Sequence, residues 1–129
     1  MTIDTQDPVD VVATFMAAMA KLDYDTAMTY VSDDCEYVNP PLGTVSGPAG
    51  IRGVLEPFFA TTLENEWIIK TTATDGSVVF MERLDRHRLT NGWAELPVTG
   101  VFEVHDGRIT AWRDYFDLAM LQQSFAEHS

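Results

Sequence analysis

The spacing of apolar residues changes from helical to alternating near the middle of the chain. Helical spacing follows Asp7-Pro8, which suit a helix start, and recurs over residues 23–31 and 46–61, so we predict three helices in the first half. The side chains expected to be buried by these helices are Val12, Phe15, Met16 and Met19, then Tyr24, Ala27, Met28 and Val31, then Ile51, Val54, Leu55 and Phe58. Pro57 should kink the third helix near its end.

A short alternating segment, "CEYVNPP", lies between the second and third of these helices. It stops at two prolines, which predicts a brief strand with Cys35, Tyr37 and Asn39 on one face. The expected consequence is that the tyrosine and the asparagine point to the same side of a sheet.

The second half of the chain alternates between apolar and polar residues and contains three turn signals. These signals are Asp75-Gly76, Asn91-Gly92 and Asp106-Gly107. They predict a four-stranded antiparallel meander, followed by a closing helix in "DLAMLQQSFAEH" with Leu118, Leu121 and Phe125 on one side. We therefore predict an α+β fold in one domain over residues 1–129, with a curved sheet whose helix-covered face encloses a pocket.

Charged residues occupy strand positions that should face the core. In "MERLDRHRL", alternation places Arg83, Asp85 and His87 on one face. In "RITAWRDYFD", Asp114 shares a face with Trp112 and Phe116. The strand between them has a fully apolar face that is expected to point inward and comprises Leu96, Val98, Gly100, Phe102 and Val104. If all three rows face one cavity, two aspartates and an arginine are buried together.

Two carboxylates and one arginine in an apolar pocket suggest acid–base chemistry. A single aspartate in a strand more often forms a structural ion pair or lies exposed. The trio, however, carries a net charge of −1, which should favour protonation of one carboxyl and leave an acid beside a base. Arginine suits the bridging position because its planar fork can donate to both carboxylates. Tyr37 and Asn39 could hold a water, although each alone is more often a satisfied core residue.

Composition narrows the candidate partners. Twenty acidic against eight basic residues give a net charge of −12, which disfavours nucleic acids and anionic membrane surfaces and suits a neutral or cationic small molecule. The first ten residues have no targeting pattern and no stretch is long enough to span a membrane, so we expect a cytoplasmic protein. The scattered histidines predict no metal site. Cys35, the single cysteine, is expected to be structural.

Three motifs together resemble the limonene-1,2-epoxide hydrolases. They are "EYVNPPL", "MERLD" and "GVFEVHDGRITAWRDYFDL", and the similarity extends from "TFMAAM" to the last helix. This family shares a cystatin-like cone, a curved, mixed and mostly antiparallel sheet, with ketosteroid isomerase and SnoaL-type cyclases. The family's active-site positions are occupied here by Arg83, Asp85, Asp114, Tyr37 and Asn39.

The resemblance implies one-step hydrolysis of a small cyclic or terpenoid epoxide, without a cofactor, a metal or a covalent intermediate. Asp114 would be the base that activates a water held by Tyr37 and Asn39. Asp85 would be the acid that protonates the epoxide oxygen, and Arg83 would link the two aspartates. The residues expected to line the pocket are Met19, Phe58, Leu96, Val98 and Phe116. A homodimer through the outer face of the sheet is also implied, around Val101, Ile109, Ala111 and Tyr115.

One position departs from the family. His87 stands where the family usually has an apolar residue, on the same strand face as the acid. It either lines the pocket and changes the choice of substrate or lies near the rim, and we favour the rim. Two alternative functions stay open: an isomerase or cyclase of the same fold, and a small-molecule-binding module without catalysis. The first would need an oxyanion hole, which a bridging arginine suits poorly, and the second should lack part of the polar set.

Overall fold

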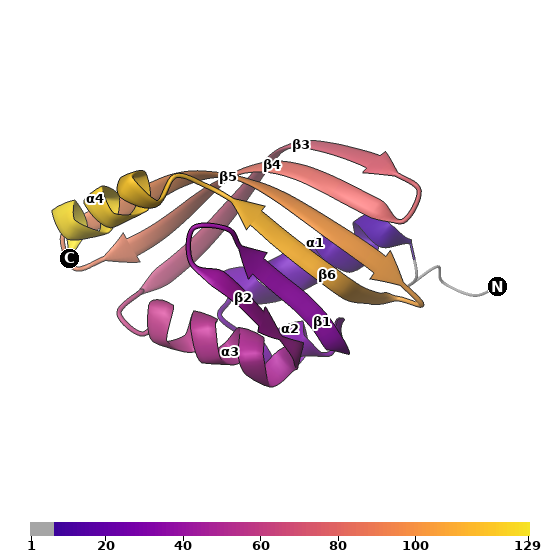
Figure 1. The fold of residues 1–129 in the computed structure, drawn as a ribbon. Helices are drawn as coiled ribbons and strands as arrows, with labels where there is room; N and C mark the ends of the chain where they lie inside the picture. Colours follow the sequence, from indigo (N-terminus) through magenta and orange to yellow (C-terminus); the bar gives the residue numbers. More distant parts are fainter. Residues whose placement is uncertain (1–6) are drawn as a thin grey trace.

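The computed structural model describes residues 7–129. Residues 1–6, on which part of the prediction about targeting rests, lie outside the described residues. Its elements, shown in Figure 1, are α1 (Pro8–Ala20), α2 (Tyr24–Met28), β1 (Val31–Asn39), β2 (Gly43–Ser46), α3 (Gly47–Phe58), β3 (Glu64–Asp75), β4 (Val78–Leu89), β5 (Gly92–His105), β6 (Arg108–Tyr115) and α4 (Leu118–His128). Within this range, no helix is both long and apolar enough to cross a membrane.

The strands form one curved, mixed sheet in the order β2-β1-β6-β5-β4-β3. The meander from β3 to β6 is antiparallel, as predicted, and β1 is the strand that pairs in parallel, with β6. The turn between β5 and β6 uses two residues with positive φ, Asp106 at 53° and Gly107 at 75°, which is the backbone of a tight hairpin turn. The α+β prediction is therefore confirmed.

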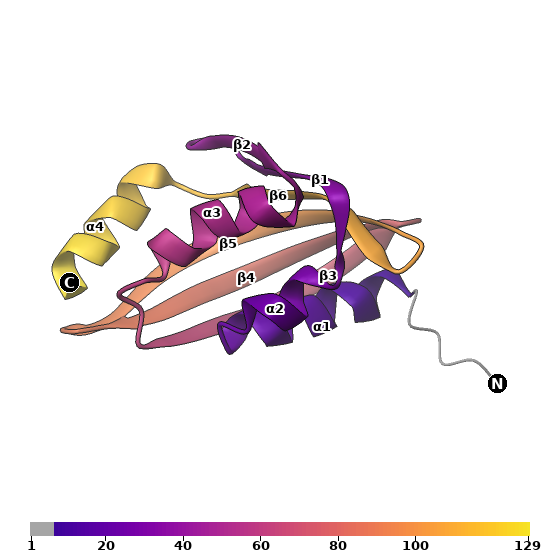
Figure 2. The ribbon, with the colours of Figure 1, turned by 90° about the horizontal axis from the view of Figure 1, so that it is seen from below.

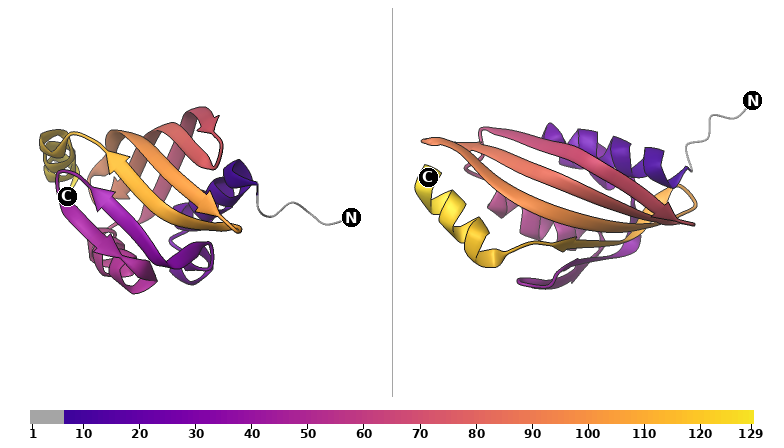
Figure 3. Two further views of the ribbon diagram at one scale, coloured as in Figure 1. Left: turned by 45° about the vertical axis from the view of Figure 1, so that its right-hand side comes forward. Right: turned by 90° about the horizontal axis from the view of Figure 1, so that it is seen from above.

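Helices α1, α2 and α3 lie on the concave side of the sheet, and α4 lies across the end of β5 (Figures 1 and 2). Seen from above, in the right panel of Figure 3, the strands lie in front of α1 and α3, and α4 lies beside the sheet. The main core joins α1 to the inner faces of β5 and β6, where Phe15 packs edge-on against Phe102 and Trp112. A smaller apolar cluster places Leu121 of α4 against Leu96 and Val98. The pocket opens between these two clusters.

The helix starts follow the capping residues that the sequence indicated. The carboxylate of Asp7 accepts hydrogen bonds from the backbone N–H groups of Val9 and Asp10, and that of Asp23 accepts one from Thr26. The helix ends differ from the prediction. The second helix stops at Met28, and Val31 starts β1 instead, where it pairs with Ile109. The third helix runs over Gly47–Phe58 rather than to Thr61, with Pro57 in its last turn.

Strand β2 was not predicted. The prolines after Asn39 form a turn rather than ending the sheet, because the Leu42 N–H donates to the Asn39 carbonyl at 2.7 Å and the chain returns antiparallel to β1. This hairpin extends the sheet over α3 and brings Leu42 to the pocket.

The prediction that Ile109 lies on the outer face was wrong. The ladder between β5 and β6 shifts register between Glu103 and Val104, so one extra residue of β6 is accommodated at this point. Such a bulge reverses the side-chain alternation on one side of it. Ile109 is therefore fully buried in the core, whereas Tyr115 is exposed on the outer face.

Candidate active site

Arg83 is hydrogen-bonded to two aspartates that lie on different strands. It is on β4 with Asp85, and Asp114 is on β6, with β5 between the two strands. Its Nε and Nη2 donate to the Asp85 carboxylate at 2.8 and 2.9 Å, and its Nη1 and Nη2 donate to the Asp114 carboxylate at 3.1 and 3.0 Å. Both contacts are bidentate, so four of the guanidinium's five N–H groups are committed to the two carboxylates.

A glycine on the intervening strand makes this bridge possible. Gly100 pairs with Met81 of β4 and with Asp114 of β6, so it lies below the path of the Arg83 side chain. A Cβ atom at this position would come within 2.6 Å of Arg83 Nη1 and 2.9 Å of Asp114 Oδ1. Any side chain here would therefore displace the guanidinium or the carboxylate.

The trio is almost completely removed from solvent. Arg83 is 1% exposed, and Asp85 and Asp114 are 6% exposed each. Burial raises the pKa of the Asp114 carboxyl above its ordinary value, although the Arg83 charge acts in the opposite direction. Burial also disfavours the charged form of Arg83, but the carboxylates of Asp114 and Asp85 outweigh this effect and raise its pKa. The guanidinium thus stays charged while Asp114 holds a proton more tightly than an exposed aspartate.

Two tryptophans position the charged groups. The Arg83 guanidinium carbon lies 4.9 Å from the centroid of the Trp67 ring, a distance at which the ring stabilises a cation. The Trp112 Nε1–H donates to Asp114 Oδ1 at 2.8 Å. One oxygen of Asp114 therefore accepts from both Trp112 and Arg83, which fixes the orientation of the carboxylate.

Tyr37 and Asn39 reach the same pocket from β1. The Tyr37 ring stacks on Trp112 with the ring centroids 3.9 Å apart. Burial and the nearby charge of Asp114 raise the pKa of Tyr37, so its hydroxyl remains protonated. Asn39 is also buried, and its Oδ1 has no hydrogen-bond partner among the described residues. A buried acceptor in a pocket wall is suited to a donor that enters from outside the chain.

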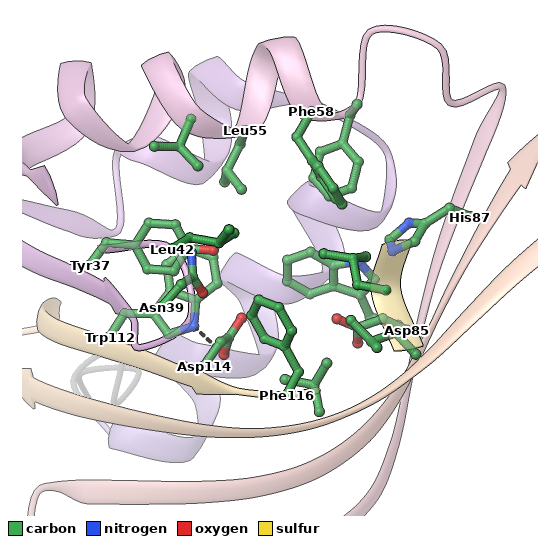
Figure 4. Close-up of a pocket in the computed structure, with 16 residues that line it drawn as sticks. Tyr37, Asn39, Leu42, Leu55, Phe58, Asp85, His87, Trp112, Asp114 and Phe116 are labelled. Atoms are coloured by element: carbon green, nitrogen blue, oxygen red, sulfur yellow. Dashed lines mark hydrogen bonds between the residues drawn. The ribbon is translucent and has the colours of Figure 1, made fainter. Parts of the chain in front are cut away.

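Apolar side chains from α3, α4 and the sheet complete the pocket. Figure 4 shows Asp85 and Asp114 on the sheet side, with Leu55 and Phe58 facing them from α3. The lining residues are Tyr37, Asn39, Leu42, Val54, Leu55, Phe58, Phe59, Trp67, Asp85, His87, Leu96, Val98, Trp112, Asp114, Phe116 and Leu121. Phe58, Leu96, Val98 and Phe116 therefore line it, as the sequence predicted. Met19 does not, because α1 packs behind the pocket and buries this side chain in the main core.

His87 lies in the pocket wall and not at the rim that the sequence analysis favoured. The residue is only 2% exposed, because Phe59 of the α3 end and Phe125 of α4 pack against its ring at centroid distances of 5.2 and 5.5 Å. Burial, together with the charge of Arg83, lowers the pKa of His87 to about 4. The imidazole is therefore neutral near pH 7.

Sequence reasoning missed three contributors to the site. Trp67 contacts the guanidinium, Gly100 makes room for it, and Phe59 covers His87. A glycine in the middle of the inward apolar row of β5 was a usable signal, because strand glycines often mark a close approach. No such signal marks Trp67, because the face of the sheet on which its side chain lies depends on the register between β3 and β4.

Two further predictions concern residues without a catalytic assignment. Cys35 is buried in the core, where burial, with the charges of Asp34 and Glu36, raises the pKa of its thiol to about 12. The thiol is therefore neutral, which fits a structural role. Within residues 7–129, no three His, Cys, Asp or Glu side chains come together in an arrangement that could hold a metal ion.

The fold and the site together define a cone-shaped α+β protein with a buried Asp-Arg-Asp trio in an apolar pocket. Residues 6–126 match the family described as limonene-1,2-epoxide hydrolase catalytic domain. The chain is 35% identical over 107 residues to the epoxide hydrolase EphG of Mycobacterium tuberculosis, which covers 83% of this chain and 71% of that protein.

Solved structures agree. An LEH-like epoxide hydrolase from M. tuberculosis superposes with a TM-score of 0.81 and 30% identity, covering 98% of this chain and 94% of the other. A SnoaL-like protein from Shewanella putrefaciens shares the fold, with a TM-score of 0.82 at 19% identity over 93% of this chain and 86% of its own. The chain belongs to the limonene-1,2-epoxide hydrolase family, and its membership supports epoxide hydrolysis as the activity.

Proposed function

We propose that this protein hydrolyses a small, largely apolar epoxide to a vicinal diol in one step, by general acid–base catalysis and without a metal or cofactor. The observation that carries the proposal is the Arg83 bridge between Asp85 and Asp114 at the wall of an apolar pocket. The bridge keeps two carboxyl groups close together with one excess negative charge, so one proton can be shared between an acid and a base.

Asp114 is the base in this proposal. Its place in the pocket beside Tyr37 and Asn39 supports the role, and once ionised it accepts a proton from water more readily than an exposed carboxylate because burial raises its pKa. The water would accept a hydrogen bond from the Tyr37 hydroxyl and donate to the free Oδ1 of Asn39 and to Asp114. The unpartnered Asn39 Oδ1 supports this arrangement, because it offers the water an acceptor that no described residue already occupies.

Asp85 is the acid. As the water oxygen attacks an epoxide carbon, the bond from that carbon to the epoxide oxygen breaks, and the oxygen takes the proton of Asp85. Asp114 simultaneously takes a proton from the water, so the reaction leaves the proton on the other carboxyl. Arg83 stays charged throughout and stabilises whichever carboxyl is ionised. Return of the proton to Asp85 resets the site for the next turnover.

The isomerase or cyclase alternative is less well supported. Proton transfer beside a carbonyl requires donors aimed at the developing oxyanion. Four of the five N–H groups of Arg83 already serve the two aspartates, so the guanidinium cannot fill that role without breaking the bridge. The bonding of Arg83 therefore favours addition of water to an epoxide over proton transfer beside a carbonyl.

The test is to incubate the purified protein with cyclic, terpenoid and aryl epoxides and to measure diol formation. Asp85→Asn and Asp114→Asn should each lower kcat by roughly 100-fold or more while the circular dichroism spectrum is retained, because each removes a proton-transfer group at nearly constant volume. Asp106→Asn, at an exposed turn position that tolerates asparagine, is the matched control and should keep full activity. Absence of diol from every epoxide, or near-normal turnover in either site variant, would refute the proposal.

A further inference from the structure

The orientation of the Asn65 amide, which contacts the His87 ring, is fixed by its neighbours. Asn65 is buried, and its Nδ2 donates to the Met19 carbonyl at 3.2 Å. Its Oδ1 accepts from the Trp67 Nε1–H at 3.1 Å, and the same oxygen lies 2.5 Å from His87 Nδ1. Exchanging the amide N and O atoms would place an NH₂ group against the Trp67 donor, so this orientation is required.

This arrangement determines which nitrogen of His87 carries the proton. An amide oxygen only accepts hydrogen bonds, so Nδ1 must be the donor to Asn65. The ring is neutral near pH 7 because burial lowers its pKa to about 4, so Nε2 carries a lone pair. No described residue donates to Nε2. The side chain therefore presents an unpartnered hydrogen-bond acceptor.

The surroundings of that acceptor are otherwise apolar. Phe58, Phe59 and Phe125 pack around the His87 ring with centroids 4.9 to 6.0 Å from one another or from the imidazole, and they supply no hydrogen-bond donor. In Figure 4, His87 lies at the opposite end of the pocket from Tyr37 and Asn39. A ligand that fills the pocket would extend from the carboxylates toward this nitrogen.

We propose that His87 Nε2 accepts a hydrogen bond from a hydroxyl or similar donor on the substrate, so that the preferred substrates are epoxides that carry such a group away from the oxirane ring. This inference rests on the proposed hydrolase function. His87 and Asp85 point the same way from β4 two residues apart, which places the donor roughly 7 Å along the strand from the epoxide oxygen. The phenylalanine rings around His87 would contact a hydrocarbon spacer.

The expected selectivity follows from the cost of leaving the acceptor without a partner. A substrate without a donor would displace solvent from Nε2 and return no hydrogen bond. We expect the donor-bearing epoxide to have a kcat/KM about tenfold higher than that of a matched epoxide without the donor. The preference should be greatest at the chain length that spans the distance from Asp85 to His87.

The test uses 1,2-epoxyalkanes of roughly four to eight carbons with a terminal hydroxyl, each paired with its methyl ether, which keeps the oxygen but loses the donor. The wild-type protein should favour the alcohol at one intermediate length. His87→Leu should abolish the alcohol preference and raise activity on the ethers, whereas His105→Leu, the same change at an exposed strand end, should retain the wild-type preference. An absent preference, or one that survives in His87→Leu, would overturn the inference.

A second measurement does not depend on turnover. The ¹⁵N chemical shifts of the wild-type imidazoles should show His87 protonated at Nδ1 and unprotonated at Nε2, and the terminal-hydroxyl diols should shift Nε2 while the methyl-ether diols should not. If no epoxide is hydrolysed but this shift is seen, the hydrolase proposal fails and the His87 assignment holds. If epoxides are hydrolysed while Nε2 is protonated or unresponsive to the hydroxyl, the His87 assignment fails and the hydrolase proposal holds.

Discussion

Arg83 shows why the charged trio is better explained by chemistry than by stability. Removing a guanidinium and two carboxylates from water carries a large desolvation penalty, and buried ion pairs are often no more stabilising than apolar residues of similar size. The surrounding core offers apolar neighbours that could fill this space. The trio also retains one excess negative charge, which a purely structural bridge would not require. A proton-transfer mechanism requires both carboxyls, one as the acid and the other as the base.

His87 should make the folded state sensitive to mild acid. Its pKa is about 4 in the folded protein because of burial and the Arg83 charge, against about 6.5 in an unfolded chain. Between these values the unfolded state binds the proton more tightly, so the contribution to stability is complete above pH 6.5 and is lost as the pH falls toward 4. We expect a loss of about 2 kcal/mol between pH 7 and pH 5 from this residue.

Urea unfolding at several pH values measures this effect. The wild-type free energy of unfolding should fall by about 2 kcal/mol more than that of His87→Gln over the same pH interval. His105→Gln controls for the loss of an imidazole at an exposed site and should follow the wild-type curve. Parallel curves for wild type and His87→Gln would show that His87 is not held neutral by the fold.

The acidic and basic members of the site could be predicted because strand alternation is a local property. Arg83 and Asp85 are two residues apart on one strand, and Asp114 lies on another strand between Trp112 and Phe116. The face of the sheet that each side chain occupies could therefore be predicted from its own strand alone. The burial of His87 could not be predicted in the same way. It depends on where Phe59 and Phe125 lie, and these come from the ends of two helices whose positions are set only by tertiary packing.

At the level of elements, β5 supports the active site as a spacer. It separates the strand that carries Arg83 from the strand that carries Asp114, and its inner face provides Leu96 and Val98 to the pocket. Because Gly100 has no Cβ atom, the Arg83 guanidinium can cross β5 at this position. The geometry of the trio is thus a property of three adjacent strands together.

Gly100→Ala should disrupt this arrangement. The added methyl group would lie 2.6 Å from Arg83 Nη1, so the guanidinium must move and at least one hydrogen bond to Asp114 is lost. We expect a drop in kcat/KM of at least about tenfold and a destabilisation of about 1–3 kcal/mol. Steady-state kinetics and thermal unfolding measure the two effects.

Gly53→Ala is the matched control for this change. Gly53 lies in α3 with open space where a Cβ would be placed, so alanine should stabilise the helix by about 0.5–1 kcal/mol and leave turnover unchanged. Wild-type kinetics for Gly100→Ala would mean that the bridge across β5 is not needed for the reaction.

The predicted elements succeeded where caps and turn residues specify them, as at Asp7, Asp23 and the three hairpins. The ends of α2 and α3 and the whole of β2 depended on longer-range partners. Val31 fits both a helical stripe and a strand, and its parallel pairing with Ile109, far along the chain, decides between them. Similarly, the prolines after Asn39 are compatible with a chain that leaves the sheet, and only the pairing of β2 with β1 makes them a hairpin turn.

At the scale of the whole molecule, the outer face of the sheet carries exposed apolar side chains. Ile68, Phe80 and Tyr115 are 40%, 40% and 46% exposed, and they come from β3, β4 and β6. Helices α1 and α3 cover the other face, as the right panel of Figure 3 shows. Large apolar side chains exposed on one sheet face favour association through that face.

We therefore expect a homodimer through this face, as the family resemblance implied. Sedimentation velocity at micromolar concentration should show a dimer, and Phe80→Glu should shift it toward monomer because two added charges would meet near a symmetric interface. Leu63→Glu, an exposed apolar position in the loop before β3, is the control and should leave the dimer intact. A wild-type protein that sediments only as a monomer would contradict the prediction.

The most direct test of the whole account follows the oxygen that water contributes. A single turnover with enzyme in excess over epoxide, run in ¹⁸O-labelled water, should place the label in the first diol formed, with inversion at the attacked carbon. Asp85 and Asp114 should remain unlabelled, as mass spectrometry of their peptides would show. A first-turnover diol that carries unlabelled oxygen, with ¹⁸O appearing in an aspartate, would mean that a carboxylate attacks the epoxide and that the one-step mechanism is wrong.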